Sequence, residues 1–142
     1  MDAAEMQADR DTVEVDRPEV LAEVQALFER YERALVDNDV EALDGFFWPD
    51  ARVLRFGGGE NLYGIEAIRA FRHARTPPGA RELRNAVVTT FGRDFATTHT
   101  EFYRADPTRC GRQSQTWVRF EEGWRIVSAH VSMIEVQPGG LA

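Results

Sequence analysis

The spacing of apolar residues divides the chain into a helical first half and a strand-rich second half. From Pro18 to Asp37 they recur every three or four residues, as on one face of a long helix. Pro18 suits the first helical turn, and Asp16 lies close enough before it to help cap the helix. The same spacing predicts two shorter helices, over residues 40–47 and 65–75.

After Gly79 the pattern changes to the alternation that is typical of strands. Two short strands are also expected on either side of the glycine triplet that precedes the third helix. Helices followed by a meander of strands predict an α+β fold, with three helices packed on one face of a curved antiparallel sheet. The six predicted strands cover residues 52–56, 60–63, 82–91, 94–106, 111–121 and 124–135.

The last strand is apolar on both of its faces. An antiparallel strand with one face in water would carry polar residues on that face. We therefore expect one face to pack on the helices and the other on a second subunit, in a homodimer through the sheet. A two-sided core within one chain is the alternative. Strict alternation puts Trp124, Ile126, Ser128, His130, Ser132 and Ile134 on one face, and Arg125, Val127, Ala129, Val131 and Met133 on the other.

The length of 142 residues and the distribution of its net charge of −7 indicate one folded domain. Residues 1–17 hold six acidic and two basic residues, which predicts a disordered acidic leader. A domain over residues 18–136 and a flexible tail over 137–142 complete the division. The domain has no basic stripe for nucleic acid, no apolar run for a membrane span and no secretory signal, so we expect a cytoplasmic protein.

All 17 basic residues are arginines. The absence of lysine excludes a Schiff-base or P-loop lysine, so any cationic contact with a substrate falls to arginine, whose planar fork suits carboxylates. The three histidines His73, His99 and His130 lack the close spacing of metal ligands. We therefore predict no metal and no cofactor. Cys110, the single cysteine, lies in a predicted turn, so a cysteine nucleophile is not expected.

The segment RFGGGENLYG, residues 55–64, concentrates candidate chemistry. A simple turn needs only one or two glycines. Three consecutive glycines beside Arg55, Glu60 and Asn61 indicate a backbone that comes close to something small and polar.

Four motifs in order resemble the AtzH-like family of the NTF2-like, or SnoaL-like, superfamily. They are RFGGGENLYG, then FGRDFA at 91–96, GRQSQTWVRF at 111–120 and GWRIVSAHVS at 123–132. The family includes HpxZ-type proteins of oxalurate catabolism. The resemblance implies a cone of helices and curved sheet around one pocket. It also implies a cofactor-free decarboxylating amidohydrolase of nitrogen catabolism that acts on a small carboxylated urea or ureide, such as 1,3-dicarboxyurea, with an amidase as a possible partner. A noncatalytic, metabolite-binding or amidase-accessory dimer is the alternative.

The resemblance also implies a catalytic pair, Tyr31 in FERYERAL and Arg55 in LRFG. The residues themselves leave other roles open. Tyr31 lies on the apolar stripe of the first helix and could be a core tyrosine, and Arg55 could be paired with Glu60 or Asp50. Around the pair we expect substrate-binding residues from the hairpin and the last two strands, namely Asn61, Tyr63, Gln115, Trp117 and His130.

Two closures of the turn at residues 121–123 are possible. A two-residue loop places Gln115 opposite His130, whereas a three-residue loop with a glycine bulge places Ser114 there. A structural role for His130, without a catalytic one, is the simpler alternative.

Overall fold

The computed structural model describes residue 2 and residues 12–137. Its helices are α2 (Pro18–Asp37), α3 (Val40–Phe46) and α4 (Ile65–Ala74), close to the predicted bounds. The amphipathic stripe explains α2, which buries Val20, Val24, Phe28, Tyr31, Ala34 and Leu35.

Six strands form one sheet in the order β2-β1-β6-β5-β4-β3. All neighbouring pairs are antiparallel except β1 and β6, which run parallel, so the sheet is mixed and the expectation of a purely antiparallel sheet was wrong. The parallel pair arises because the chain leaves β1 through a hairpin and a helix, and reaches β6 only after three further strands. The strands are β1 (Leu54–Phe56), β2 (Asn61–Tyr63), β3 (Glu82–Phe91), β4 (Phe95–Tyr103), β5 (Arg109–Phe120) and β6 (Gly123–Glu135).

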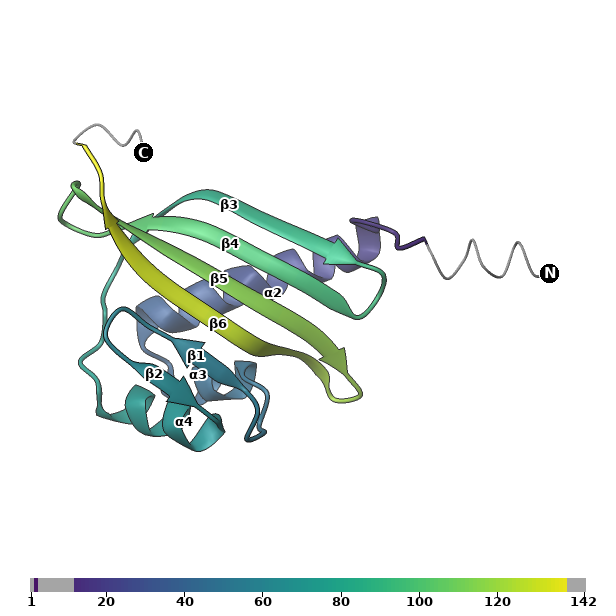
Figure 1. Cartoon of the computed structure of the whole chain (residues 1–142), viewed down its shortest axis with the longest axis horizontal. Coiled ribbons are helices and arrows are strands. Elements are labelled where there is room, and N and C mark those ends of the chain that lie inside the picture. The colour runs from purple at the N-terminus through teal and green to yellow at the C-terminus, as the bar shows by residue number, and fades with distance from the viewer. Residues whose placement is uncertain (1, 3–11, 138–142) are drawn as a thin grey trace.

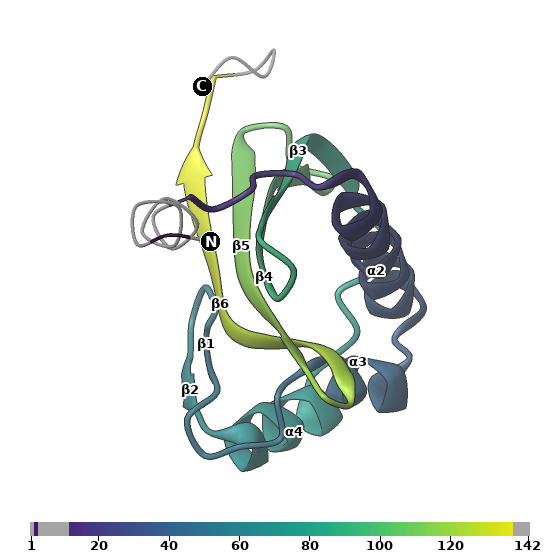
Figure 2. The same cartoon turned by 90° about the vertical axis from the view of Figure 1, so that its right-hand side faces the viewer.

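The three helices cover one face of this sheet (Figure 1). Figure 2 shows α2 alongside β3, β4 and β5, while β5 and β6 bend toward α3 and α4 at the end of the sheet near the 121–122 turn. The core fills the space between the layers with aliphatic and aromatic side chains. Its fully buried members include Val24, Leu43, Phe47, Val53, Ile68, Trp117 and Ile126.

A β-bulge in β6 changes which residues of that strand face the helices. Trp117 pairs with Ile126, but Thr116, the residue before Trp117 in β5, pairs with Ser128. Val127 is therefore an extra residue in β6. Beyond the bulge, Ala129 faces inward, and the strict alternation expected for this strand was wrong. The turn has a two-residue loop, which is closed by the pair Phe120 and Gly123. Because of the bulge, this loop nevertheless places Ser114 opposite His130.

The segment before α2 contacts the far edge of the sheet. Val15 forms a bridge to Phe91, and the Asp16 carboxylate accepts a hydrogen bond of 2.9 Å from the Thr90 backbone N–H. Asp16 therefore contacts β3 and does not cap α2, because α2 has no side-chain cap. Most of the predicted acidic leader, residues 1 and 3–11, and residues 138–142 of the predicted tail lie outside the described residues.

None of the described helices combines the length and the apolar character needed to cross a membrane.

Candidate active site

A small cavity lies between α2 and the inner face of the sheet. Its volume is about 60 Å³, enough for a few water molecules, each of which needs on the order of 10–15 Å³. Twelve residues line it: Tyr31, Leu35, Arg55, Arg75, Pro78, Arg81, Phe102, Arg104, Gln113, Gln115, Ala129 and Val131.

Tyr31 lies on the buried stripe of α2 and is only 4% exposed. The rings of Phe46 and Phe47 pack edge-on against it, with centroids at 5.5 and 6.4 Å, and hold its orientation. Burial raises the pKa of the Tyr31 phenol, but the positive charges of Arg72, Arg55 and Arg81 outweigh this effect, so the pKa lies below its ordinary value. Tyr31 is thus a buried phenol whose ionised form is stabilised by cations.

Arg55 reaches the cavity from β1 and is paired with Glu60. Its Nη1 lies 2.8 Å from Glu60 Oε1, an ion pair across the hairpin that joins β1 to β2. Gly57 makes room for this pair, because a Cβ at that position would overlap the Glu60 carboxylate. At least one glycine of the triplet is therefore explained by a carboxylate of the chain itself, whereas a Cβ at Gly58 or Gly59 would meet nothing.

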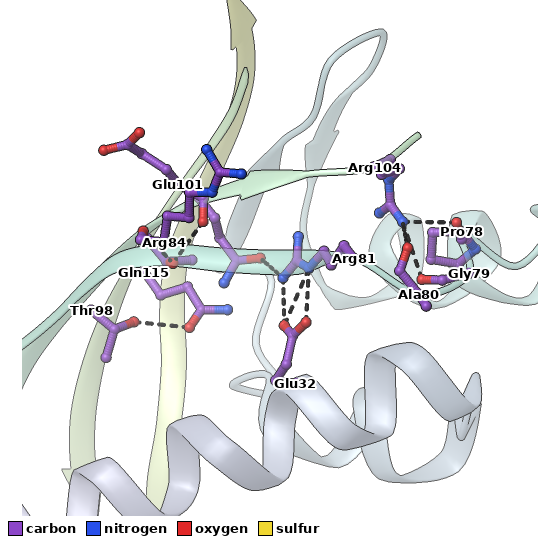
Figure 3. Close-up of polar contacts among 12 residues, drawn as sticks. Glu32, Pro78, Gly79, Ala80, Arg81, Arg84, Thr98, Glu101, Arg104 and Gln115 are labelled. Carbon is purple, nitrogen blue, oxygen red and sulfur yellow. Dashed lines mark hydrogen bonds and ion pairs between the residues drawn. The ribbon is translucent and has the colours of Figure 1, made fainter. Parts of the chain in front are cut away.

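Arg81 is a buried cation that is paired through its Nε and Nη2 atoms. Its Nη2 and Nε donate to Glu32 at 2.6 and 3.0 Å, and Nη2 also donates to Gln113 Oε1 at 2.8 Å. Its guanidinium carbon lies 4.4 Å from the centroid of Phe102. Figure 3 shows this arginine extended toward Glu32. The ion pair between them joins α2 to the start of β3 beside the cavity.

Arg104 holds the loop that precedes β3. Its Nη1 donates to the carbonyl oxygens of Pro78, Gly79 and Ala80 at 2.8, 3.1 and 3.4 Å (Figure 3). Pro78 lines the cavity. The arginine therefore fastens this loop against the cavity wall.

A chain of hydrogen bonds orients the amide of Gln115. Trp117 Nε1 donates to Thr98 Oγ1 at 3.1 Å. This hydroxyl donates in turn to Gln115 Oε1 at 2.9 Å, as Figure 3 shows. Because indole nitrogen can only donate, Thr98 Oγ1 is the acceptor of the first bond, and its own hydrogen remains available for Gln115 Oε1. In this orientation Gln115 presents its Nε2 group as a donor, and that atom is buried without a partner among the described residues. A ligand carbonyl or carboxylate oxygen could satisfy it.

Two further arginines come from α4. Arg72 is 2% exposed, and its three side-chain nitrogens have no acidic or carbonyl partner among residues 12–137, although its guanidinium acts on the Tyr31 phenol and lowers the pKa of that group. Arg75, at the end of the helix, lines the cavity, and its Nε and Nη2 are likewise buried and unpartnered there. Burial, followed by the charges of Arg72 and Arg55, lowers the pKa of Arg75 to about 10. The site therefore holds more positive charge than its two acids neutralise.

The predicted site residues fall on both faces of the sheet. Tyr31, Arg55 and Gln115 line one cavity, and Trp117 lies behind Gln115. Asn61, Tyr63 and His130 lie on the opposite face: Leu62, between the first two, pairs with the inward-facing Arg55, and the bulge turns His130 outward beside Phe56. Their expected position in the cavity was therefore wrong.

Sequence reasoning missed most of the arginine cluster. One signal was present for Arg72, because it follows Ile65 and Ile68 on the buried stripe of α4. Burying a charged side chain is costly, so an arginine at such a position points to a functional site. For Gln113, the alternation with Gln115 on β5 is a comparable signal. Arg81, Arg104 and Glu32 carry no local signal, because they meet only through contacts distant in sequence.

No group of three histidine, cysteine, aspartate or glutamate residues in the described part of the chain could hold a metal ion.

Comparison with known structures identifies close relatives. A protein of unknown function from the DUF3225 family of Pectobacterium atrosepticum is 57% identical, over 85% of this chain and 95% of that chain, with a TM-score of 0.83. A cystatin-like fold protein from Burkholderia xenovorans is 49% identical, over 89% of this chain and 100% of that one, with a TM-score of 0.85. An NTF2-like protein of unknown function from Pseudomonas putida, 23% identical over 79% and 84% of the two chains with a TM-score of 0.65, shares the fold.

A search of curated proteins gives no match. The family model named AtzH-like matches residues 13–137, which include every described helix and strand. The chain therefore belongs to the AtzH-like family.

Proposed function

We propose that the cavity is the active site of a cofactor-free decarboxylating amidohydrolase for a small carboxylated urea or ureide, such as 1,3-dicarboxyurea. The observation that carries the proposal is the convergence of Tyr31 and Arg55 on one cavity with an excess of arginine. A guanidinium binds a carboxylate through two parallel hydrogen bonds. A buried phenol with a lowered pKa is a proton donor whose conjugate base is stabilised in place.

The decarboxylation itself needs one proton and the cleavage of one carbon–nitrogen bond, and it consumes no water. Tyr31 donates its proton to the ureido nitrogen that bears the reacting carboxylate, as the bond from nitrogen to the carboxylate carbon breaks. The electron pair of that bond stays on nitrogen, and the carboxylate leaves as carbon dioxide. The substrate loses one negative charge, which passes to the Tyr31 phenolate until water restores the proton. Gln115 Nε2 would donate to the urea carbonyl, which carries part of the developing charge.

Replacing Arg55 with alanine tests this assignment. Loss of a charged hydrogen bond to the substrate should lower kcat/KM for 1,3-dicarboxyurea by roughly 10- to 100-fold. Carbon dioxide release measures the turnover. The matched control is Arg52→Ala, on the same side of the hairpin, whose side chain is 77% exposed and pairs with Asp50. If both variants turn over substrate at the rate of the unmodified protein, the catalytic proposal is wrong.

A noncatalytic metabolite-binding or amidase-accessory role is the second candidate, and the ion pair between Arg55 and Glu60 favours it. A guanidinium that is already neutralised binds a substrate carboxylate less strongly. Such a protein would bind small carboxylates in the same cavity without releasing carbon dioxide.

We also propose a homodimer through the outer face of the sheet. Tyr63 on β2, Val87 on β3 and Phe95 on β4 are large apolar residues exposed on this face, which no described helix covers. Sedimentation equilibrium of the whole chain should give twice the monomer mass, and Val87→Glu should shift it toward the monomer. A monomeric unmodified protein would contradict the proposal. Single exposed apolar residues are common on monomers, so the mass measurement decides.

A further inference from the structure

The five arginines around Tyr31 differ in how their charges are satisfied. Arg55 and Arg81 pair with Glu60 and Glu32, and Arg104 donates to backbone carbonyls. Arg72 and Arg75 have no such partner among residues 12–137. Leaving a buried charge unpaired is costly, so two neighbouring guanidinium groups of this kind indicate a place for an anion.

Arg75 lies close to Arg55 at the cavity. Both guanidinium groups border the ring of Phe71, with their central carbons 5.3 Å (Arg55) and 5.9 Å (Arg75) from its centroid. Both residues line the same cavity, Arg55 from β1 and Arg75 from the end of α4. Both guanidinium groups are therefore within reach of one small ligand in this cavity.

We infer that Arg75, supported by the buried charge of Arg72, binds a second carboxylate of the ligand, so that the cavity prefers dianions to monoanions of equal length. The inference rests on the proposed function only in using the same cavity. Arg55 binds one carboxylate and Arg75 the other, while Gln115 faces the uncharged centre of the molecule. Arg72 is a positioning residue, which holds positive charge behind Tyr31.

Binding of two stable acids tests the inference without any turnover. Glutarate has the same five-atom chain as 1,3-dicarboxyurea and two carboxylates, whereas pentanoate has the same chain length and one carboxylate. In titration calorimetry, Arg75→Gln should weaken glutarate binding by roughly 10- to 100-fold and change pentanoate binding less than about twofold. The matched control is Arg69→Gln, on α4, whose side chain is 43% exposed and lies 3.8 Å from Glu66. It should change neither affinity.

The outcomes separate this inference from the proposed function. Equal weakening of both acids in Arg75→Gln, or no preference for glutarate in the unmodified protein, would overturn the inference, even if 1,3-dicarboxyurea is turned over. A selective loss of glutarate binding would support it, even if no carbon dioxide is released. Because Arg75 is only partly buried, the variant should fold, and circular dichroism would verify this.

Discussion

Replacing Tyr31 with phenylalanine is expected to reduce kcat for 1,3-dicarboxyurea by roughly 10²- to 10⁴-fold, the usual contribution of a well-placed general acid. The phenylalanine ring keeps the edge-on contacts with Phe46 and Phe47, so the fold should be retained. Glutarate should still bind, because the arginines remain. Steady-state release of carbon dioxide, with the thermal midpoint measured alongside, checks the prediction.

The activity that depends on Tyr31 should also change with pH. Tyr31 can donate only while it is protonated. Burial raises the pKa of Tyr31, but the charges of Arg72, Arg55 and Arg81 bring it below its ordinary value. Activity should therefore fall as pH rises through this lowered pKa, and an ultraviolet titration should show one phenol ionising there that Tyr31→Phe removes. Tyr63→Phe, on the outer face and 66% exposed, serves as the control and should keep full activity. Full activity of Tyr31→Phe would contradict the role of the phenol.

Replacing Glu32 with alanine is expected to cost about 3–5 kcal/mol of unfolding free energy, the range for removing one partner of a buried ion pair. The Arg81 side chain is 2% exposed and would keep its charge beside the other arginines of the site. Only Gln113 would remain as a hydrogen-bonding partner of its guanidinium. Equilibrium denaturation in urea measures the loss.

A second substitution distinguishes the lost pair from damage to α2. Glu32→Ala combined with Arg81→Leu removes both charges and should recover much of the stability, because the unpaired cation is gone. Glu29→Ala, at an exposed position one turn earlier on α2, should change the unfolding free energy by less than about 0.5 kcal/mol. A loss below about 1 kcal/mol in Glu32→Ala would show that Arg81 does not depend on its partner.

The helices illustrate what could be predicted from local pattern. The bounds of α2 match the predicted range because its apolar stripe, its first proline and its end at Asp37 are all encoded within the segment. In contrast, the bulge at Val127 lies where β6 pairs with both β1 and β5, and no local sequence pattern predicts it. That one residue moved His130 out of the expected site and Ala129 into it.

The residues of the candidate site also differ in whether the sequence could predict them. Tyr31 and Arg55 were predicted from the resemblance to the AtzH-like family, and Gln115 was placed around that pair. Arg81 could not be predicted, because Glu32, 49 positions away in sequence, explains its burial. Pairing between distant segments depends on how the whole chain packs, so it cannot be predicted from a short stretch of sequence.

The amino-acid sequence by itself determined the α+β class, the extents of the helices and the residue types available for chemistry, since periodicity and composition are local properties. Only the tertiary structure decided which of these residues meet. It placed arginines from β1, from α4 and from the segments beside β3 and β4 around Tyr31, left Arg72 and Arg75 without acids among the described residues, and turned Asn61, Tyr63 and His130 to the outer face. The physical reason is that strand register and helix docking bury as much apolar surface as possible, and the positions of the charges follow from that packing.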